Sequence, residues 1–233
     1  MAAEPSSGHV RPESRAERRH DVLVVVLAAV AGSTDAISFL GLGVFTSVMT
    51  ANMVLLGLSA GQHDGARALH AGTALAGFIA ATVLTSRLMT DAGQLGPVWP
   101  RKVSAALMAE AVVLVAVAVG WEIAAGHPRG VVQLVLLAAL AVAMGIQGAA
   151  IRALGIPGLS TTYLTGLLSA VLSDLATGRG ASGRRPAIAI LLGLILGAAG
   201  GGLLLVQAPR LAPLLPLALL AAVIAAAAIP ARR

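Results

Sequence analysis

Apolar segments long enough to cross a lipid bilayer follow one another along almost the whole of this chain. Several of them exceed the ~20 residues that a helix needs for one crossing at a rise of ~1.5 Å per residue. They are rich in Leu, Val, Ala and Gly, and none alternates apolar and polar residues as a strand would. Because only helices and closed barrels span a bilayer, we expect an all-α, polytopic membrane protein.

The composition agrees with a membrane solvent, since 58% of the 233 residues are hydrophobic and 11% are charged. The chain has no cysteine, which excludes disulfides, thiolate metal sites and thiol nucleophiles. Its net charge is +6, but the basic residues lie mainly in the tails and loops with few aromatic residues beside them. This pattern is typical of topology determinants, and we expect no nucleic-acid partner.

We predict two parts, a tail and a membrane domain. Residues 1–21 are polar and rich in Arg, which predicts a disordered basic cytoplasmic tail. Residues 22–233 form a single transmembrane domain made of two repeats, about 22–125 and 131–230. The tail and the apolar run after it resemble a signal peptide, but cleavage there would remove the start of the first repeat. The predicted apolar elements are 22–42, 44–61, 71–88, 103–125, 131–154, 158–177, 187–206 and 211–229.

The distribution of Lys and Arg bears on how many elements cross the membrane. If all eight cross with the N-terminus inside, 11 basic residues are inside and 5 outside. If the second and sixth elements dip in and return, the counts become 13 and 3. Since basic residues accumulate on the cytoplasmic side, we favour six full spans plus two re-entrant or broken elements, with eight spans as the alternative. Three crossings per repeat would place the repeats upside down relative to each other, which is a transporter signature. Eight spans would make the repeats parallel and weaken that inference.

Two polar motifs occur about 115 residues apart inside apolar segments. The first is Thr46-Ser47-Val48-Met49-Thr50-Ala51, and the second is Thr161-Thr162-Tyr163-Leu164-Thr165-Gly166. Helical spacing i, i+4 predicts two hydroxyl stripes that face inward, one with Thr46 and Thr50 and one with Thr161, Thr165, Ser169 and Ser173. The stripes either contact a solute or bond their own and neighbouring helices.

Asp35 is the strongest single signal, because it lies about two thirds along the first span. A carboxylate costs ~2.5–3.5 kcal/mol at a helix centre on insertion scales, so we expect a proton or cation site or a structural pair, for example with Arg152. Arg152 itself is expected to reach the headgroups or to bind Asp35 or an anion. The Gly193, Gly197 and Gly201 ladder predicts close helix packing. The expected substrate-binding residues are Asp35, Thr46, Ser47, Thr50, Asn52, Gln147, Arg152, Thr161, Thr162, Tyr163 and Thr165.

Several motifs together resemble the YoaK-like bacterial membrane proteins, a family of unknown function. They are Gly32-Ser33-Thr34-Asp35-Ala36, Met49-Thr50 with Asn52, Met144-Gly145-Ile146-Gln147, Pro157-Gly158 and the second polar motif. The resemblance covers about residues 22–232 and implies a multi-pass protein of the bacterial inner membrane. The basic tail predicts that the N-terminus lies in the cytoplasm. The chain departs from the family pattern at Ala51, where Gly is more frequent, and at Gly148, where Asn is frequent.

We therefore expect a small-solute transporter or permease, with a proton bound at Asp35 as the candidate coupling ion. The alternative is a structural, lipid-interacting or regulatory membrane protein in which the hydroxyls only hold helices together, and an intramembrane enzyme ranks third. We expect no catalytic residue, cofactor or metal site. The expected partners are the lipid bilayer, a small solute or ion and, as an alternative, a second copy of the chain.

Overall fold

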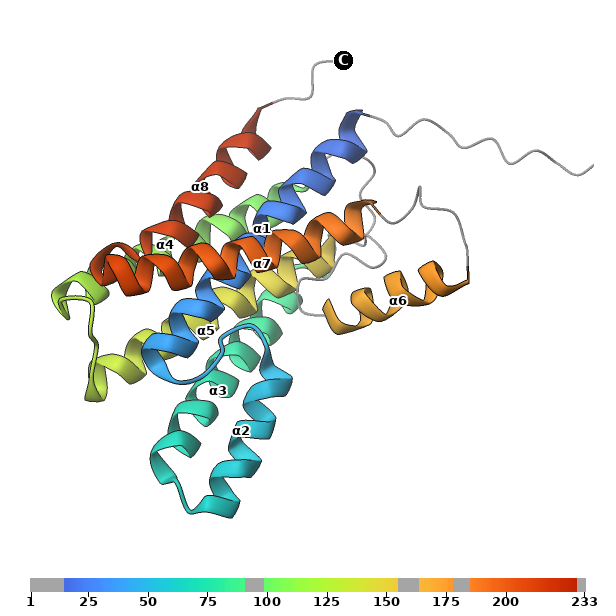
Figure 1. The fold of residues 1–233 in the computed structure, drawn as a ribbon. Coiled ribbons are helices and arrows are strands. Elements are labelled where there is room, and N and C mark those ends of the chain that lie inside the picture. The colour runs from blue at the N-terminus through green and yellow to red at the C-terminus, as the bar shows by residue number, and fades with distance from the viewer. Residues whose placement is uncertain (1–14, 91–98, 155–163, 178–184, 230–233) are drawn as a thin grey trace, which may run out of the picture.

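The computed structural model describes residues 15–90, 99–154, 164–177 and 185–229, and this part of the chain folds into helices without a strand. The helices are α1 (Arg15–Leu42), α2 (Met49–Gln62), α3 (Gly65–Leu88), α4 (Arg101–Ile123), α5 (Gly130–Ala153), α6 (Leu164–Ala176), α7 (Arg185–Gln207) and α8 (Leu214–Ala228), with a short 3₁₀ turn η2 (Pro209–Leu211) before α8 (Figure 1).

Six helices are long and apolar enough to cross a bilayer, namely α1, α3, α4, α5, α7 and the segment from η2 through α8. The other two, α2 and α6, have 14 and 13 residues. At 1.5 Å per residue they are ~20 Å long, too short for the ~30 Å hydrocarbon core. The predicted polytopic helical membrane protein is confirmed.

Three predicted boundaries were wrong. Helix α1 begins at Arg15, so the last residues of the predicted disordered tail are helical. Helix α3 begins at Gly65 and not at residue 71, because Asp64 caps it by accepting a hydrogen bond from the Arg67 amide. Residues 44–48, expected to begin the second helix, are not helical, and α2 begins only at Met49.

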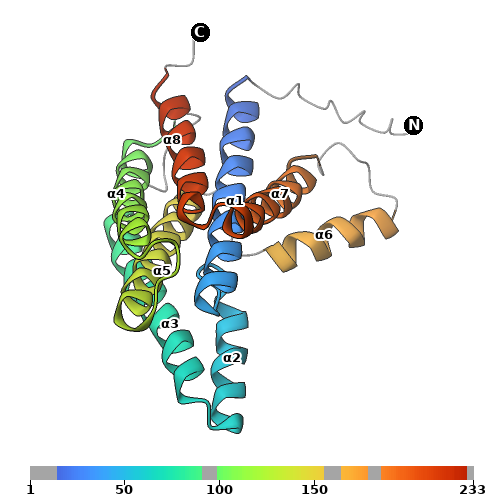
Figure 2. The same ribbon diagram turned by 60° about the vertical axis from the view of Figure 1, so that its left-hand side comes forward.

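The long helices begin and finish at two opposite ends of the bundle. At one end the starts of α1 and α4 meet the end of α8: the His20 and Trp99 rings are 5.6 Å apart, and Arg19 donates to the carbonyls of Ala226 and Ile229. At the other end Trp121 Nε1 of α4 donates to the Pro209 carbonyl over 2.9 Å. Figure 2 shows the described ends of α1 and α8 on the same side of the molecule.

Helix α2 does not cross between these ends. Near its C-terminus α1 lies beside the connection from α4 to α5, with Leu40 in a shared cavity. Helix α3 runs in the same direction as α5, because Gly77 lies against Ala138 and Thr82 against Gly145. Thus α3 begins at the end where α1 finishes, and α2 and α3 form a hairpin there (Figure 2).

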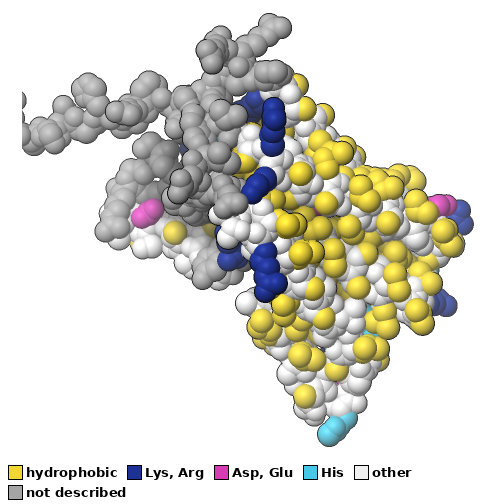
Figure 3. Space-filling view, turned by 180° about the vertical axis from the view of Figure 1, so that it is seen from behind, with side chains coloured by type: hydrophobic (Ala, Val, Ile, Leu, Met, Phe, Trp, Pro, Cys, Tyr) yellow, Lys and Arg dark blue, Asp and Glu magenta, His cyan; other side chains and the backbone are white. Residues whose placement is uncertain are grey.

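The two ends differ in charge within the described residues. One end, called the basic end below, carries Arg18, Arg19, Arg87, Arg101, Lys102, Arg152 and Arg185. The opposite end carries Arg67, Arg129 and Arg210, and Arg210 is paired with Glu122 at 3.5 Å. Seen from behind, Lys and Arg side chains gather along one side of the molecule while hydrophobic side chains cover much of the remaining surface (Figure 3).

Helix packing falls into matched pairs across the two halves of the chain. Helix α1 packs on α7 as α5 packs on α3, and α4 packs on α5 as α8 packs on α1. The Gly193 ladder lies in the first of these contacts, since added Cβ atoms at Gly193, Gly197 and Gly201 would strike backbone atoms of α1. The predicted close packing therefore operates inside one chain, between α1 and α7.

Candidate functional site

The sharpest interruption in the described bundle is the non-helical stretch of residues 43–48, called the α1–α2 break below. Helix α1 ends at Leu42, and Gly43 follows with a left-handed φ of +84° while its N–H donates to the Phe39 carbonyl over 3.0 Å. A glycine in this conformation satisfies the end of a helix without steric cost. The chain then turns back toward α1 before α2 begins.

Asp35 holds the middle of the break. Its Oδ1 accepts from the Thr46 and Ser47 amides, each at 2.8 Å, and from Thr46 Oγ1 at 3.3 Å. Its Oδ2 accepts from Ser47 Oγ. The carboxyl group is 6% exposed, and both oxygens are engaged. Hydrogen bonds donated to a buried carboxylate offset the free-energy cost of its burial.

Asn52 holds the start of the break from the other side. This fully buried residue of α2 accepts from the Phe45 N–H at 3.1 Å and donates to the Phe45 carbonyl at 2.6 Å. Asp35 and Asn52 together satisfy the amides of three consecutive residues that no helix satisfies. Irregular backbone inside a membrane protein needs such partners, because no lipid can supply them.

Most hydroxyls near Asp35 bond their own helix. Ser33 and Thr34 both donate to the Val30 carbonyl, at 2.9 and 2.8 Å, and Ser38 donates to the Asp35 carbonyl at 3.1 Å. This is the helix-bonding role of Ser and Thr in apolar surroundings. Ser38 Oγ also lies 3.4 Å from Thr46 Oγ1, which extends the network into the break.

An apolar groove of about 360 Å³ runs beside Asp35 between α1, α7 and the break. The Phe39 and Phe45 rings stack at its margin, with centroids 4.5 Å apart and planes at 11°. Val48 also lines the groove and is 39% exposed. The groove brings the surface of the molecule close to the Asp35 network.

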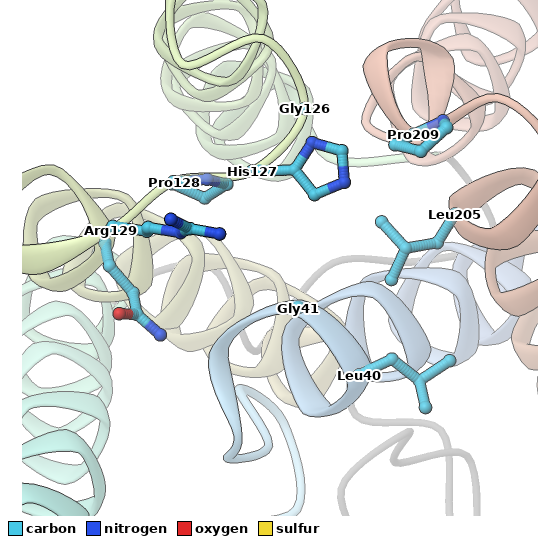
Figure 4. Close-up of a pocket in the computed structure, with 9 residues that line it drawn as sticks. Leu40, Gly41, Gly126, His127, Pro128, Arg129, Leu205 and Pro209 are labelled. Atoms are coloured by element: carbon cyan, nitrogen blue, oxygen red, sulfur yellow. The ribbon is translucent and has the colours of Figure 1, made fainter.

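A second cavity, of about 420 Å³, opens at the end opposite the basic end. His127 and Arg129 reach it from the connection between α4 and α5, while Leu205 of α7 and the last turn of α1 lie across from them (Figure 4). Leu40 lines both this cavity and the groove beside Asp35. The two hollows are therefore neighbours around the end of α1.

The structure brings together only part of the predicted site. Asp35, Thr46, Ser47 and Asn52 meet at the α1–α2 break. Thr50 is exposed on α2, so Thr50 and Asn52 have separate surroundings. The predicted stripe of Thr46 and Thr50 was wrong, because Thr46 lies in the break and not on a helix.

The second predicted stripe also differs from the structure where it is described. Thr165, Ser169 and Ser173 are exposed on α6 and do not face inward. Among the described helices, α6 makes its main contact with α7, and it lies apart from the other helices (Figure 2). Thr161, Thr162 and Tyr163 lie outside the described residues.

Gln147 and Arg152, both on α5, lie away from the break. Gln147 is buried and its Nε2 donates to the Leu27 carbonyl of α1 at 3.0 Å, which is the interhelical contact expected of a membrane glutamine. Arg152 is exposed in the last turn of α5, at the basic end. Among the described residues, the hydrogen bonds of the Asp35 carboxyl group join it to Thr46 and Ser47 in the break and not to Arg152.

Sequence reasoning missed Glu110 on α4. This residue is fully buried, and neither carboxyl oxygen has a hydrogen-bond partner in the described part of the chain. A single acidic residue near the middle of an apolar span is a detectable signal. The sequence offers no second carboxylate beside Glu110 that would have singled it out. Within the described ranges, no three His, Asp or Glu side chains are grouped as a metal site would require.

Comparison with known proteins adds the family. Residues 23–227 match the family model described as "Protein of unknown function (DUF1275)". The chain belongs to this family. It is also 36% identical over 158 residues to the "UPF0700 transmembrane protein YoaK" of Bacillus subtilis (strain 168), a match that covers 67% of each chain. The YoaK-like resemblance is thus confirmed, and this member of the family is a multi-pass membrane protein. No solved structure matches the chain.

Proposed function

We propose that this DUF1275 protein is a permease for small solutes whose binding site is built at the α1–α2 break. The observation that carries the proposal is the break itself, where residues 43–48 are held as irregular backbone by the buried side chains of Asp35 and Asn52. Non-helical backbone at membrane depth is tolerated where it is buried in protein or lines a cavity. In many transporters, broken helices form the solute site.

The arrangement of the helices supports an inverted duplication as part of the proposal. Each half contributes three long helices and one short helix, and the packing pairs of one half recur in the other. Three crossings per half reverse the second half relative to the first. The basic end would face the cytoplasm of a bacterial inner membrane, because it carries seven of the ten described Lys and Arg side chains assigned to the two ends.

The path proposed for the solute enters at the end opposite the basic end. The cavity lined by His127 and Arg129 lies there, and it shares Leu40 with the groove beside Asp35. Its polar side chains suit a small polar or anionic solute. The proposal assigns no enzymatic step and no nucleic-acid partner.

A structural role is the second candidate, and the hydrogen bonds of Asp35 favour it. Oδ1 accepts from Thr46 and Ser47 of the same chain and Oδ2 accepts from Ser47, so the carboxylate holds the break without any ligand. In that case the groove beside Asp35 contacts lipid and contains no water. Proton coupling through Asp35 stays a hypothesis of the sequence, and this hydrogen bonding favours a holding role for the residue.

Water access to the groove separates these two functions without knowledge of the solute. The cysteine-free chain allows Val48→Cys to be introduced as the only thiol. A charged methanethiosulfonate reagent reacts with the thiolate, which forms only in contact with water. For a permease we expect Val48→Cys to react with this reagent in membranes.

The matched control is Val112→Cys on α4, which is 67% exposed. It is expected to react only with a lipid-soluble maleimide, as a residue facing hydrocarbon should. If Val48→Cys behaves like Val112→Cys, the groove is lipid-filled and the structural role replaces the permease.

A further inference from the structure

Glu110 lies deep within α4, away from both polar ends of the bundle. It is nine residues after Arg101, which is about 14 Å along the helix at 1.5 Å per residue. Its side chain is 0% exposed. The residue therefore occupies the middle of a membrane-spanning helix and faces protein, not lipid.

The face of α4 that carries Glu110 is otherwise apolar. The buried residues of α4 around it include Leu107 and Leu114, one helical turn to either side. This face packs against α5 and α8. The buried residues of α8 are Pro216, Leu220 and Val223, none of which can donate a hydrogen bond from its side chain.

The charged groups on the elements packed against α4 lie far from Glu110 along the helices. Helix α5 carries Arg152 in its last turn, η2 carries Arg210, and α8 carries no charged residue in its described length. On α4 itself, Arg101 and Lys102 lie at the first turn and Glu122 near the last, and Arg210 is paired with Glu122. Neither oxygen of Glu110 has a hydrogen-bond partner among the described residues.

The surroundings of Glu110 differ from those of Asp35. Asp35 accepts hydrogen bonds from two amides and two hydroxyls, whereas Glu110 accepts none from the described residues. An ion without a partner in apolar surroundings is very costly, while a neutral carboxyl group costs far less. A metal cation would need several oxygen ligands, and Glu110 belongs to no group of three His, Asp or Glu side chains among the described residues. A proton neutralises the group without further ligands.

We propose that Glu110 is a proton-binding site, buried in the seam between α4, α5 and α8 and separate from the Asp35 network. The inference goes beyond the proposed permease and does not depend on it. If the permease proposal holds, Glu110 is the group through which a proton gradient would act, in place of Asp35.

Infrared spectroscopy of the full chain in liposomes tests the proposal without a transport assay. A protonated carboxyl group has a carbonyl stretching band apart from that of a carboxylate. We expect this band at neutral pH in the unaltered protein, its loss in Glu110→Gln, and its retention in the matched variant Glu122→Gln. Raising the pH should convert the band into carboxylate absorption, because a functional proton site must release its proton.

Three results would overturn the proposal. The band could be absent from the unaltered protein at neutral pH, which would make Glu110 an ion. It could persist in Glu110→Gln, which would assign it to another carboxyl group. It could resist every pH at which the helices remain folded, which would make Glu110 a permanently neutral packing residue. The titration of the unaltered protein decides the first and third results even if Glu110→Gln fails to fold.

Discussion

At the scale of single residues, two buried carboxyl groups have opposite surroundings. Both oxygens of Asp35 accept hydrogen bonds from residues 46 and 47, whereas neither oxygen of Glu110 has a partner in the part of the chain that the structure describes. The sequence marked Asp35 because it interrupts an apolar run, but it could not identify its partners. Those partners are the amides and hydroxyls of Thr46 and Ser47, and the amides become available only because the chain leaves the helix at Gly43 and folds back.

Replacement of Asp35 tests its role in holding the break. In Asp35→Asn the group loses its charge, and an amide NH₂ meets the donor hydroxyl of Ser47 or Thr46. Hydrogen bonds to charged groups contribute about 1.5–3 kcal/mol, so we expect the free energy of unfolding to fall by about that amount. Denaturant unfolding of the purified protein in detergent measures the change.

The control for this replacement is Asp64→Asn, the same chemical change at the cap of α3. Asn caps a helix about as well as Asp, so this variant should lose only a few tenths of a kcal/mol. Equal stability of Asp35→Asn and Asp64→Asn would show that the Asp35 hydrogen bonds contribute little to holding the break.

At the scale of helices, the sequence predicted the long elements well and the short ones poorly. The six long spans follow from the length of their unbroken apolar runs, and no tertiary contact is needed to predict them. The start of α2 was misplaced because residues 44–48 are apolar enough to continue a helix. Hydrogen bonds from the side chains of Asp35 and Asn52 instead hold this segment as irregular backbone, and a local sequence pattern does not reveal such tertiary contacts.

The contact between α1 and α7 depends on glycines with no room for a side chain. A Cβ atom at Gly197 would lie 2.2 Å from the Ala29 carbonyl oxygen and 2.6 Å from its Cα, both backbone atoms. We expect Gly197→Ala to lose at least ~1–3 kcal/mol, the usual cost of overpacking. The melting temperature in detergent is the measurement.

Gly202 on the same helix provides the matched comparison. There a Cβ atom would meet only Leu40 Cδ1 at 3.6 Å, an ordinary contact. Gly202→Ala should leave the melting temperature unchanged or raise it, since Ala favours helices by ~1 kcal/mol over Gly. Equal melting temperatures of the two variants would contradict the close contact between α1 and α7.

At the scale of the whole molecule, six helices are long enough to cross the membrane and two are too short. The count of basic residues in the sequence favoured this topology, and the described helix ends sort Lys and Arg in the same way. What charge could not predict is the packing of each half on the other. That packing depends on contacts between small residues of different helices. Sequence spacing shows which small residues share a face of one helix, but not which helix that face contacts.

The proposed functional features are spread over different parts of the bundle. The break and the two hollows lie around the end of α1, whereas Glu110 lies on α4. A permease would use the first two for its solute, while Glu110 would bind a proton in the seam of α4. The two proposals can therefore fail separately, one by labelling of the groove and one by infrared titration.

Helix α2 is too short to cross the bilayer, and single-cysteine labelling tests whether it crosses. Single cysteines replace Arg18, Gly65, Thr90, Ala125 and Ala228, which are exposed residues near the ends of helices in the cysteine-free chain. With an impermeant maleimide on intact and permeabilised cells, Arg18, Thr90 and Ala228 should report one side of the membrane, and Gly65 and Ala125 the other. If Arg18 and Gly65 report the same side, α2 crosses the membrane and the six-crossing topology is wrong.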